Sequence, residues 1–202
     1  KKASEAMQLL KEARAALARL VRDVNNSIRA RVVLLPANSA GDNIIFHAEG
    51  GDVVLPLLRQ QKDGEECLSL SDFVKPCGTD YVGAFAVTAG RGIEEIISGY
   101  QQTDDFKALL YQSLSDRLAE AATELLHARV RRDIWGYAPD EWIDCQRALR
   151  AQYRGIRPAA GYPSLPDQSA IFAIEKIVGF ANVGIAVTPN GAMSPASSVS
   201  GL

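Results

Sequence analysis

The sequence contains few of the residues that build redox centres and histidine-rich metal sites. Among its 202 residues are three cysteines (Cys67, Cys77 and Cys145) and two histidines. The cysteines are scattered, odd in number and include no Cys-x-x-Cys pair, a pattern typical of reduced thiols in a cytosolic protein. Two histidines are too few for a histidine-rich metal centre. We therefore expect a cytoplasmic protein with reduced cysteines and no such metal centre.

Long apolar runs and blocks of basic charge are also missing. No apolar run approaches the ~20 residues needed to span a bilayer, and residues 1–20 carry alternating charges, unlike a secretory signal. The formal net charge is −2, so the sequence predicts neither a membrane nor a nucleic-acid partner. The glycines form no G-x-G-x-x-G or G-x-x-x-x-G-K-[ST] phosphate loop, and no G-x-S-x-G nucleophile elbow occurs. The standard nucleotide-binding and hydrolase motifs are therefore absent.

The composition is otherwise that of an ordinary globular protein, with 47% hydrophobic and 23% charged residues. Its hydrophobic pattern alternates between helical spacing and short β-branched runs. Residues 29–58 are predicted to form an antiparallel meander of strands, and the apolar run 80–90 a strand buried on both faces. The other predicted elements are helices over residues 4–24, 91–102, 104–133, 142–153 and 169–179, a strand over 181–189 and coil over 190–202.

These elements predict an α+β fold, a single mixed domain in which helices flank a twisted antiparallel sheet. We expect residues 1–28 to form an N-terminal helix and residues 29–202 the α+β core, joined in one continuous domain. The apolar residues at helical spacing on the first helix are Met7, Leu10, Leu17, Leu20, Val21 and Val24. The predicted apolar side of the long helix carries Phe106, Leu109, Leu110, Leu114, Leu118, Ala121, Leu125 and Val130.

The long helix also carries acidic residues at i, i+4 spacing. Asp116, Glu120 and Glu124 form this row, and His127 follows three residues later. Like charges at this spacing cost about 0.2–0.5 kcal/mol per pair, so something should compensate them. Two interpretations stay open: a solvated face with arginine neighbours, or carboxylates that face a cationic ligand or partner. Glu124 and His127 also form the Glu-x-x-His motif of di-iron bundles, but that site needs a second motif and two more glutamates, so we expect no metal site.

A rigid segment follows at residues 154–168, RGIRPAAGYPSLPDQ. Its three prolines and two glycines exclude a helix or a central strand. Arg154 and Arg157 stand near its start, and arginine matches a carboxylate through two hydrogen bonds. Tyr153 and Tyr162 add flat amphipathic surface suited to a planar ring. The residues alone leave two interpretations open, a solvated surface turn or a rigid backbone wall that a ligand can approach closely.

Four segments within residues 29–202 carry a resemblance to a known family, in the family's order. They are LSDFVKP…DYVGAFAVTAG, SDRLAEAATELLHARVRRDIWGYAP, YRGIRPAAGYPSLPD and SPASSVSGL. Together they resemble the activation, or reactivation, domain of cobalamin-dependent methionine synthase. The Arg-x-x-x-Gly-Tyr-Pro element at 157–163 is specific to that family.

The resemblance implies a domain that binds S-adenosylmethionine. In this family, cobalamin held by another domain is sometimes oxidised to inactive cob(II)alamin during the methylation of homocysteine to methionine. S-adenosylmethionine then donates a methyl group while a flavodoxin-type donor supplies an electron, and methylcobalamin is regenerated. The protein orients the methyl donor and the cofactor carries the chemistry, so no catalytic residue is expected in this chain. An alternative is a non-catalytic docking domain that contacts a corrinoid-binding partner and has lost ligand binding.

The resemblance also implies ligand-binding residues. Arg157 matches the motif arginine that is expected to bind the ligand's carboxylate, and Ala159 matches a position that contacts the ligand through its backbone. Acidic positions on the long helix lie near the ligand or the domain interface, where a carboxylate suits the positive sulfonium. The full expected set is Arg157, Ala159, Gly161, Tyr162, Glu120 and Asp116.

The sequence departs from the family's pattern in three places. After YPSLPD the family has His-Thr-Glu-Lys, whereas this sequence has Gln-Ser-Ala-Ile at 168–171. The family's N-terminal aspartate segment has no counterpart before Lys1, and its tyrosine segment has none after Leu202. The resemblance therefore implies a fragment or a shortened domain, with a lower affinity for S-adenosylmethionine than a full domain has.

Overall fold

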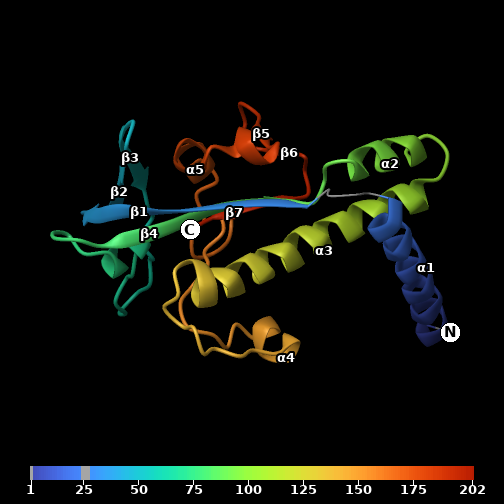
Figure 1. Cartoon of the computed structure of the whole chain (residues 1–202), viewed down its shortest axis with the longest axis horizontal. Helices are drawn as coiled ribbons and strands as arrows, with labels where there is room; N and C mark the ends of the chain where they lie inside the picture. Colours follow the sequence, from blue (N-terminus) through green and yellow to red (C-terminus); the bar gives the residue numbers. More distant parts are fainter. Residues whose placement is uncertain (1, 24–27) are drawn as a thin grey trace.

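A computed structural model describes residues 2–23 and 28–202 (Figure 1). Its centre is a five-stranded antiparallel sheet in the order β3-β2-β1-β4-β7. The strands are β1 (Arg29–Ala40), β2 (Asn43–Ala48), β3 (Gly51–Pro56), β4 (Tyr81–Thr88) and β7 (Ser198–Gly201), and a separate pair consists of β5 (Ala186–Val187) and β6 (Met193–Ser194). The helices are α1 (Lys2–Asp23), α2 (Ile93–Tyr100), α3 (Asp105–Arg129), α4 (Cys145–Leu149) and α5 (Ala170–Val178), with short helical turns η1 (Leu70–Phe73), η2 (Val130–Ile134) and η3 (Phe180–Val183).

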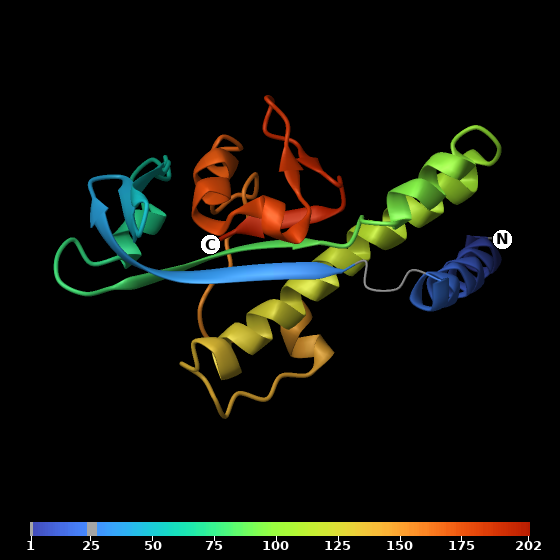
Figure 2. The ribbon, with the colours of Figure 1, turned by 45° about the horizontal axis from the view of Figure 1, so that its top comes forward.

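The helices cover both faces of the sheet. Figures 1 and 2 show α3 and α4 on one face, and α5 with β5 and β6 on the other. The main apolar core lies between the sheet and α5, where Phe46, Ile171 and Phe180 are fully buried. Burial of each such side chain contributes about 1.5–3 kcal/mol. The predicted α+β class, with helices flanking an antiparallel sheet, is confirmed.

The meander at residues 29–58 and the buried strand β4 are confirmed as well. Strand β1 pairs with β2 on one side and with β4 along residues 29–36 on the other. All five residues from Ala84 to Thr88 are buried, as a continuous apolar run predicts. This central position fixes β4 as the floor of the site described below.

The C-terminal prediction was wrong in two respects. Residues 198–201 do not form coil but strand β7, which pairs with Phe85–Thr88 of β4. Their small side chains permit this, because a Cβ on Gly201 would lie 2.1 Å from the carbonyl oxygen of Pro158 and would push the neighbouring backbone away. The strand predicted over 181–189 is reduced to the two residues of β5, because Gly184, at φ 78°, ends the turn η3 before it.

Helix α3 confirms the predicted apolar side only in part. Val130 is buried, and Leu110, Leu114 and Leu118 are partly buried against the apolar cluster that joins α3 to α1 and α2, but the helix lies on the sheet with other residues. Its buried face consists of Ala108, Tyr111, Ser115, Ala119, Thr123 and His127. Leu109 and Leu125 are 67% and 64% exposed. The small residues let the helix approach the sheet closely, and the hydroxyl of Ser115 donates to the carbonyl oxygen of Ala89 at 3.3 Å. Close packing therefore outweighs side-chain hydrophobicity on this helix, and it carries His127 into the interior.

Helix α1 confirms the first predicted helix, although Val24 falls outside the described residues. Ala16 and Leu20 are buried against α2 and α3. Met7 and Val21, which share the same helical spacing, are 66% and 75% exposed. The helix therefore buries only part of its apolar side. None of the helices in the described part of the chain is long and apolar enough to cross a membrane.

Candidate functional site

The rigid segment 154–168 adds to the edge of the sheet. The amide of Ala160 donates to the carbonyl oxygen of Ser200 at 3.0 Å, and the amide of Leu202 donates to that of Pro158 at 2.9 Å. Ala159 lies opposite Gly201 in an antiparallel bridge. The prolines and glycines thus form a fixed wall along β7.

A tight turn closes this wall. The amide of Gly161 donates to the carbonyl oxygen of Leu165 at 2.9 Å, and the amide of Leu165 donates to that of Tyr162 at 2.8 Å. Gly161 has a φ of 86°, and a Cβ there would lie 2.6 Å from Oε1 of Gln168, so glycine is required at this position. The Gln168 side chain also donates to the carbonyl oxygen of Gly191 at 3.2 Å. Gln168 therefore links the turn to the loop before β6.

Arg157 points back from this wall toward helix α3. Its Nη2 donates to Oε1 of Glu124 in an ion pair, and its side chain is 19% exposed. Its Nε is buried and has no hydrogen-bond partner in the structure. Arg154 behaves differently, because it is exposed and donates to the carbonyl oxygen of Tyr137 at 3.0 Å. The structure therefore separates the two arginines of the segment.

The acidic row on α3 has a different partner at each turn. Asp116 accepts from the hydroxyl of Ser197 at 2.6 Å. Glu120 forms a surface ion pair with Arg117 at 2.6 Å, and Glu124 pairs with Arg157. Eight helical residues at 1.5 Å per residue separate Asp116 from Glu124 by about 12 Å. The row therefore runs from the loop before β7 to the start of the rigid wall.

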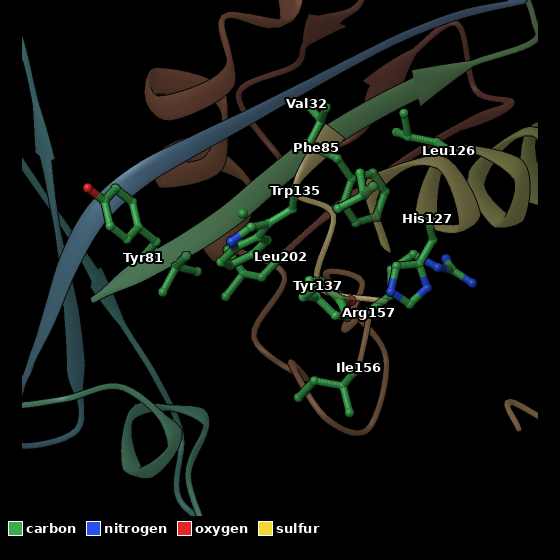
Figure 3. A pocket seen from close by; sticks show the side chains of 13 residues that line it. Val32, Tyr81, Phe85, Leu126, His127, Trp135, Tyr137, Ile156, Arg157 and Leu202 are labelled. Atoms are coloured by element: carbon green, nitrogen blue, oxygen red, sulfur yellow. The ribbon is translucent and has the colours of Figure 1, made fainter. Parts of the chain in front are cut away.

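A pocket of about 170 Å³ lies beside Arg157. Figure 3 shows Tyr81 at one end of it and His127 with Arg157 at the other. Its walls come from β1, β4, the end of α3, the segment after η2, the start of the rigid wall and the C-terminus. The lining residues are Val32, Tyr81, Val82, Gly83, Phe85, Leu126, His127, Val130, Trp135, Tyr137, Ile156, Arg157 and Leu202. The pocket is mostly apolar, with two nitrogen-bearing side chains at one end.

His127 is buried without hydrogen bonds. Its side chain is 5% exposed, and neither ring nitrogen has a partner. The ring meets Tyr153 edge to face, with 4.9 Å between centroids. Desolvation, together with the nearby cations Arg131 and Arg157, lowers its pKa from 6.5 to about 4. His127 is therefore a neutral imidazole at neutral pH, with a donor and an acceptor at the pocket wall.

A buried ion pair supports this end of the site. Glu141 accepts from Nε of Arg131 and, at 2.9 Å, from the backbone amide of Arg154. Desolvation alone would raise the pKa of Glu141, but these hydrogen bonds outweigh it and lower the pKa. The Arg131 guanidinium also lies over the ring of Tyr153, 4.3 Å from its centroid. Glu141 thus ties the start of the rigid wall to the end of α3.

The structure assembles part of the predicted site. Arg157 and Ala159 lie together at the edge of the sheet, and Arg157 reaches α3. Gly161 and Tyr162 lie at the exposed turn, where Tyr162 is 56% exposed. Asp116 lies about 12 Å along α3 from the Arg157 contact. The predicted residues therefore form a line along the wall and the helix.

Sequence reasoning missed the pocket. Its aromatic residues Trp135 and Tyr137 flank Gly136, whose φ of 74° breaks the helical pattern. That break was visible in the sequence, but its position over the sheet was not. Within residues 2–23 and 28–202, no group of three or more His, Cys, Asp or Glu side chains could hold a metal ion. The geometry suits binding of a charged, partly apolar ligand.

Two comparisons with known proteins bear on this site. A family model described as "Vitamin B12 dependent methionine synthase, activation domain" matches residues 1–202. The chain is also similar to a solved structure described as "Crystal Structure of the MetH Reactivation Domain bound to AdoHcy", with 37% sequence identity and a TM-score of 0.88. The match covers 98% of this chain and 64% of that chain. The chain thus spans a little under two thirds of the length of that structure.

Proposed function

The chain belongs to the family of activation domains of vitamin B12-dependent methionine synthase, and from this premise we propose that it binds S-adenosylmethionine and presents it to a cobalamin held by a partner domain. When bound, S-adenosylmethionine supplies an activated methyl group. The similar structure contains AdoHcy, the demethylated product of that compound. The residues of this chain would bind and orient the ligand without acting as nucleophile or base.

The observation that carries the proposal is the state of Arg157. Its guanidinium lies at the edge of the pocket, and its side chain is 19% exposed. Nη2 donates to Glu124, whereas Nη1 makes no hydrogen bond to any described residue, so a ligand carboxylate would find a free donor there. Arginine binds a carboxylate through two parallel hydrogen bonds, so Arg157 fits the role of carboxylate clamp.

We assign the remaining residues to the same line. Ala159 is held by the bridge to Gly201 and offers its backbone beside Arg157, while Gly161 and Tyr162 shape the turn. Glu120 and Asp116 lie further along α3, where carboxylates favour a sulfonium or a partner domain. These assignments make the wall and the acidic row two sides of one ligand-binding surface.

The match covers 64% of the similar chain. The reaction of the whole enzyme is therefore part of the proposal as well. The cobalamin-binding domain of methionine synthase, on the same or a separate chain, would receive the methyl group. A flavodoxin-type donor would supply the electron that reduces cob(II)alamin. In that reaction S-adenosylmethionine would supply the methyl group and leave as S-adenosylhomocysteine, while the residues of this chain would hold and orient the methyl donor.

Isothermal titration calorimetry with S-adenosylmethionine tests the binding proposal. Arg157→Ala removes the carboxylate clamp, and we expect the dissociation constant to rise about 10- to 100-fold, the value of one charged hydrogen bond or more. Arg154→Ala is the matched control, since Arg154 is exposed and contacts a backbone carbonyl, and it should bind like the wild type. Equal affinity of wild type and Arg157→Ala would remove Arg157 from the site.

A second candidate function is docking without ligand binding. The exposed side chains Trp142, Leu149 and Ile156, at 79%, 83% and 64% exposure, lie in the chain segments around the site and favour a protein partner. On this alternative the chain gives no heat with S-adenosylmethionine but co-purifies with an isolated cobalamin-binding domain. Heat with the ligand excludes the alternative.

A further inference from the structure

The ion pair between Arg157 and Glu124 joins two elements that are distant in the sequence. Arg157 comes from the rigid wall and Glu124 from the exposed side of α3, 33 residues earlier. The Arg157 side chain is 19% exposed, and that of Glu124 is 38% exposed. The pair therefore places one cation and one anion side by side at the pocket edge, where a ligand can reach both.

The Arg157 guanidinium has a donor that makes no hydrogen bond within the described residues. Glu124 takes Nη2, whereas Nη1 makes no hydrogen bond to any described residue, and part of the side chain is exposed. Arg59 in the same chain shows what one guanidinium can hold. It binds Asp42 through Nε and Nη2, at 3.0 and 2.6 Å, and Asp72 through Nη1 and Nη2, at 2.6 and 2.7 Å. Arg157 can therefore keep Glu124 and accept a second carboxylate.

Glu124 also has unused capacity. Its Oε1 accepts from Arg157, whereas Oε2 accepts no hydrogen bond from any part of the chain that the structure describes. An ionised carboxylate has about four acceptor sites. A second cation next to Oε2 would meet a carboxylate that is already oriented by Arg157. An ammonium group fits this place better than a guanidinium because it is compact and donates in three directions.

We propose that Arg157 and Glu124 together bind the α-amino-acid group of the ligand as a zwitterion, with its carboxylate on Arg157 and its ammonium on Glu124. The inference rests on the proposed function, because it deepens the binding of S-adenosylmethionine at the same site. It names Glu124 as the residue that determines specificity. The site then distinguishes adenosyl thioethers that carry a free α-amino group from those that lack one.

Two other roles for Glu124 make different predictions. If Glu124 only orients Arg157, its loss weakens every ligand that carries a carboxylate, with or without an amino group. If Glu124 competes with the ligand for Arg157, its loss strengthens binding. The zwitterion clamp alone predicts a loss that depends on the amino group of the ligand.

The experiment measures the binding of two probes by calorimetry. One is S-adenosylhomocysteine, and the other is its deaminated analogue, which keeps the carboxylate and the thioether. The variants are Glu124→Gln, which preserves shape, and Glu95→Gln, a control that makes the same charge change at an exposed position on α2. Thermal melts of each variant confirm that it is folded.

We expect Glu124→Gln to weaken S-adenosylhomocysteine about tenfold or more, the loss of one charge-assisted hydrogen bond. Binding of the deaminated analogue should change less than threefold, and Glu95→Gln should match the wild type with both probes. Equal losses for both probes, or tighter binding by Glu124→Gln, would overturn the inference and leave the proposed function intact. Absence of binding by the wild-type chain would instead overturn the proposed function and this inference with it.

Discussion

Replacement of His127 by phenylalanine should make the stability of the protein less sensitive to acid. Phenylalanine keeps a ring against Tyr153 and removes two buried nitrogens that have no partner. Burial lowers the pKa of His127 from 6.5 to about 4. Below pH 6.5 His127 therefore binds a proton in the unfolded chain, whereas in the folded chain it stays neutral until the pH falls to about 4.

The size of the effect follows from that difference. A pKa difference of one unit corresponds to about 1.4 kcal/mol. The free energy of unfolding of the wild type should fall by about 2 kcal/mol between pH 7 and pH 5 through His127 alone. The loss should continue to a total on the order of 3 kcal/mol near pH 4 and then level off. At pH 7 the phenylalanine variant should be at least as stable as the wild type.

Urea unfolding at pH 7 and pH 5 measures the effect. Carboxyl groups that do not interact with His127 contribute equally to both proteins, so the difference between wild type and His127→Phe reports His127 together with its coupling to Glu141. The other histidine, His47, is exposed and pairs with Asp52 at 2.9 Å. His47→Gln should keep the His127-dependent loss. If wild type and His127→Phe lose the same stability between pH 7 and pH 5, the histidine is not held neutral, and the account of the pocket wall is wrong.

Three further substitutions test the packing around the site. Gly201→Ala places a Cβ 2.1 Å from the carbonyl oxygen of Pro158. It should therefore lower the melting temperature and speed amide hydrogen exchange at Ala160. An unchanged melting temperature would refute the close approach. Arg131→Met leaves Glu141, whose side chain is 16% exposed, without its charged partner. It should lower the free energy of unfolding by about 3 kcal/mol, measured in urea at pH 7. A loss under 1 kcal/mol would contradict a buried ion pair. Ala119→Leu overpacks the face between α3 and the sheet, where Ala119 is 1% exposed, and calorimetric melts should report about 1–3 kcal/mol of lost stability, whereas a neutral result would mean that the helix can shift.

Much of the fold could be predicted from local patterns. Short β-branched runs separated by turn residues predict the meander at 29–58, and a continuous apolar run predicts β4. In each case the pattern within the segment itself records how that segment is buried. The C-terminal strand could not be predicted. Small residues in 198–201 resemble coil, and their pairing with β4 depends on a partner more than 100 positions away.

The long helix shows the same limit. Hydrophobicity favours Leu109 and Leu125 as its buried side, but close packing on the sheet selects Ala119, Thr123 and His127 instead. His127 therefore appeared in the sequence as part of a possible metal motif and lies in the structure as a neutral pocket residue.

For the site, the family resemblance predicted Arg157 and Ala159, and the structure places both residues at the sheet edge. The partner of Arg157 could not be predicted from spacing. Glu124 lies 33 residues away on another element, and only the fold places the two side chains together.

A crystal structure of this chain with S-adenosylhomocysteine would show directly whether Arg157 and Glu124 bind the ligand. The ligand should lie between the wall 157–162 and the acidic side of α3. Its carboxylate should lie within hydrogen-bond distance of Arg157 and its ammonium within that distance of Glu124. A ligand bound elsewhere, or one at this place whose amino-acid group points away from Arg157, would mean that Arg157 and Glu124 do not form the binding site.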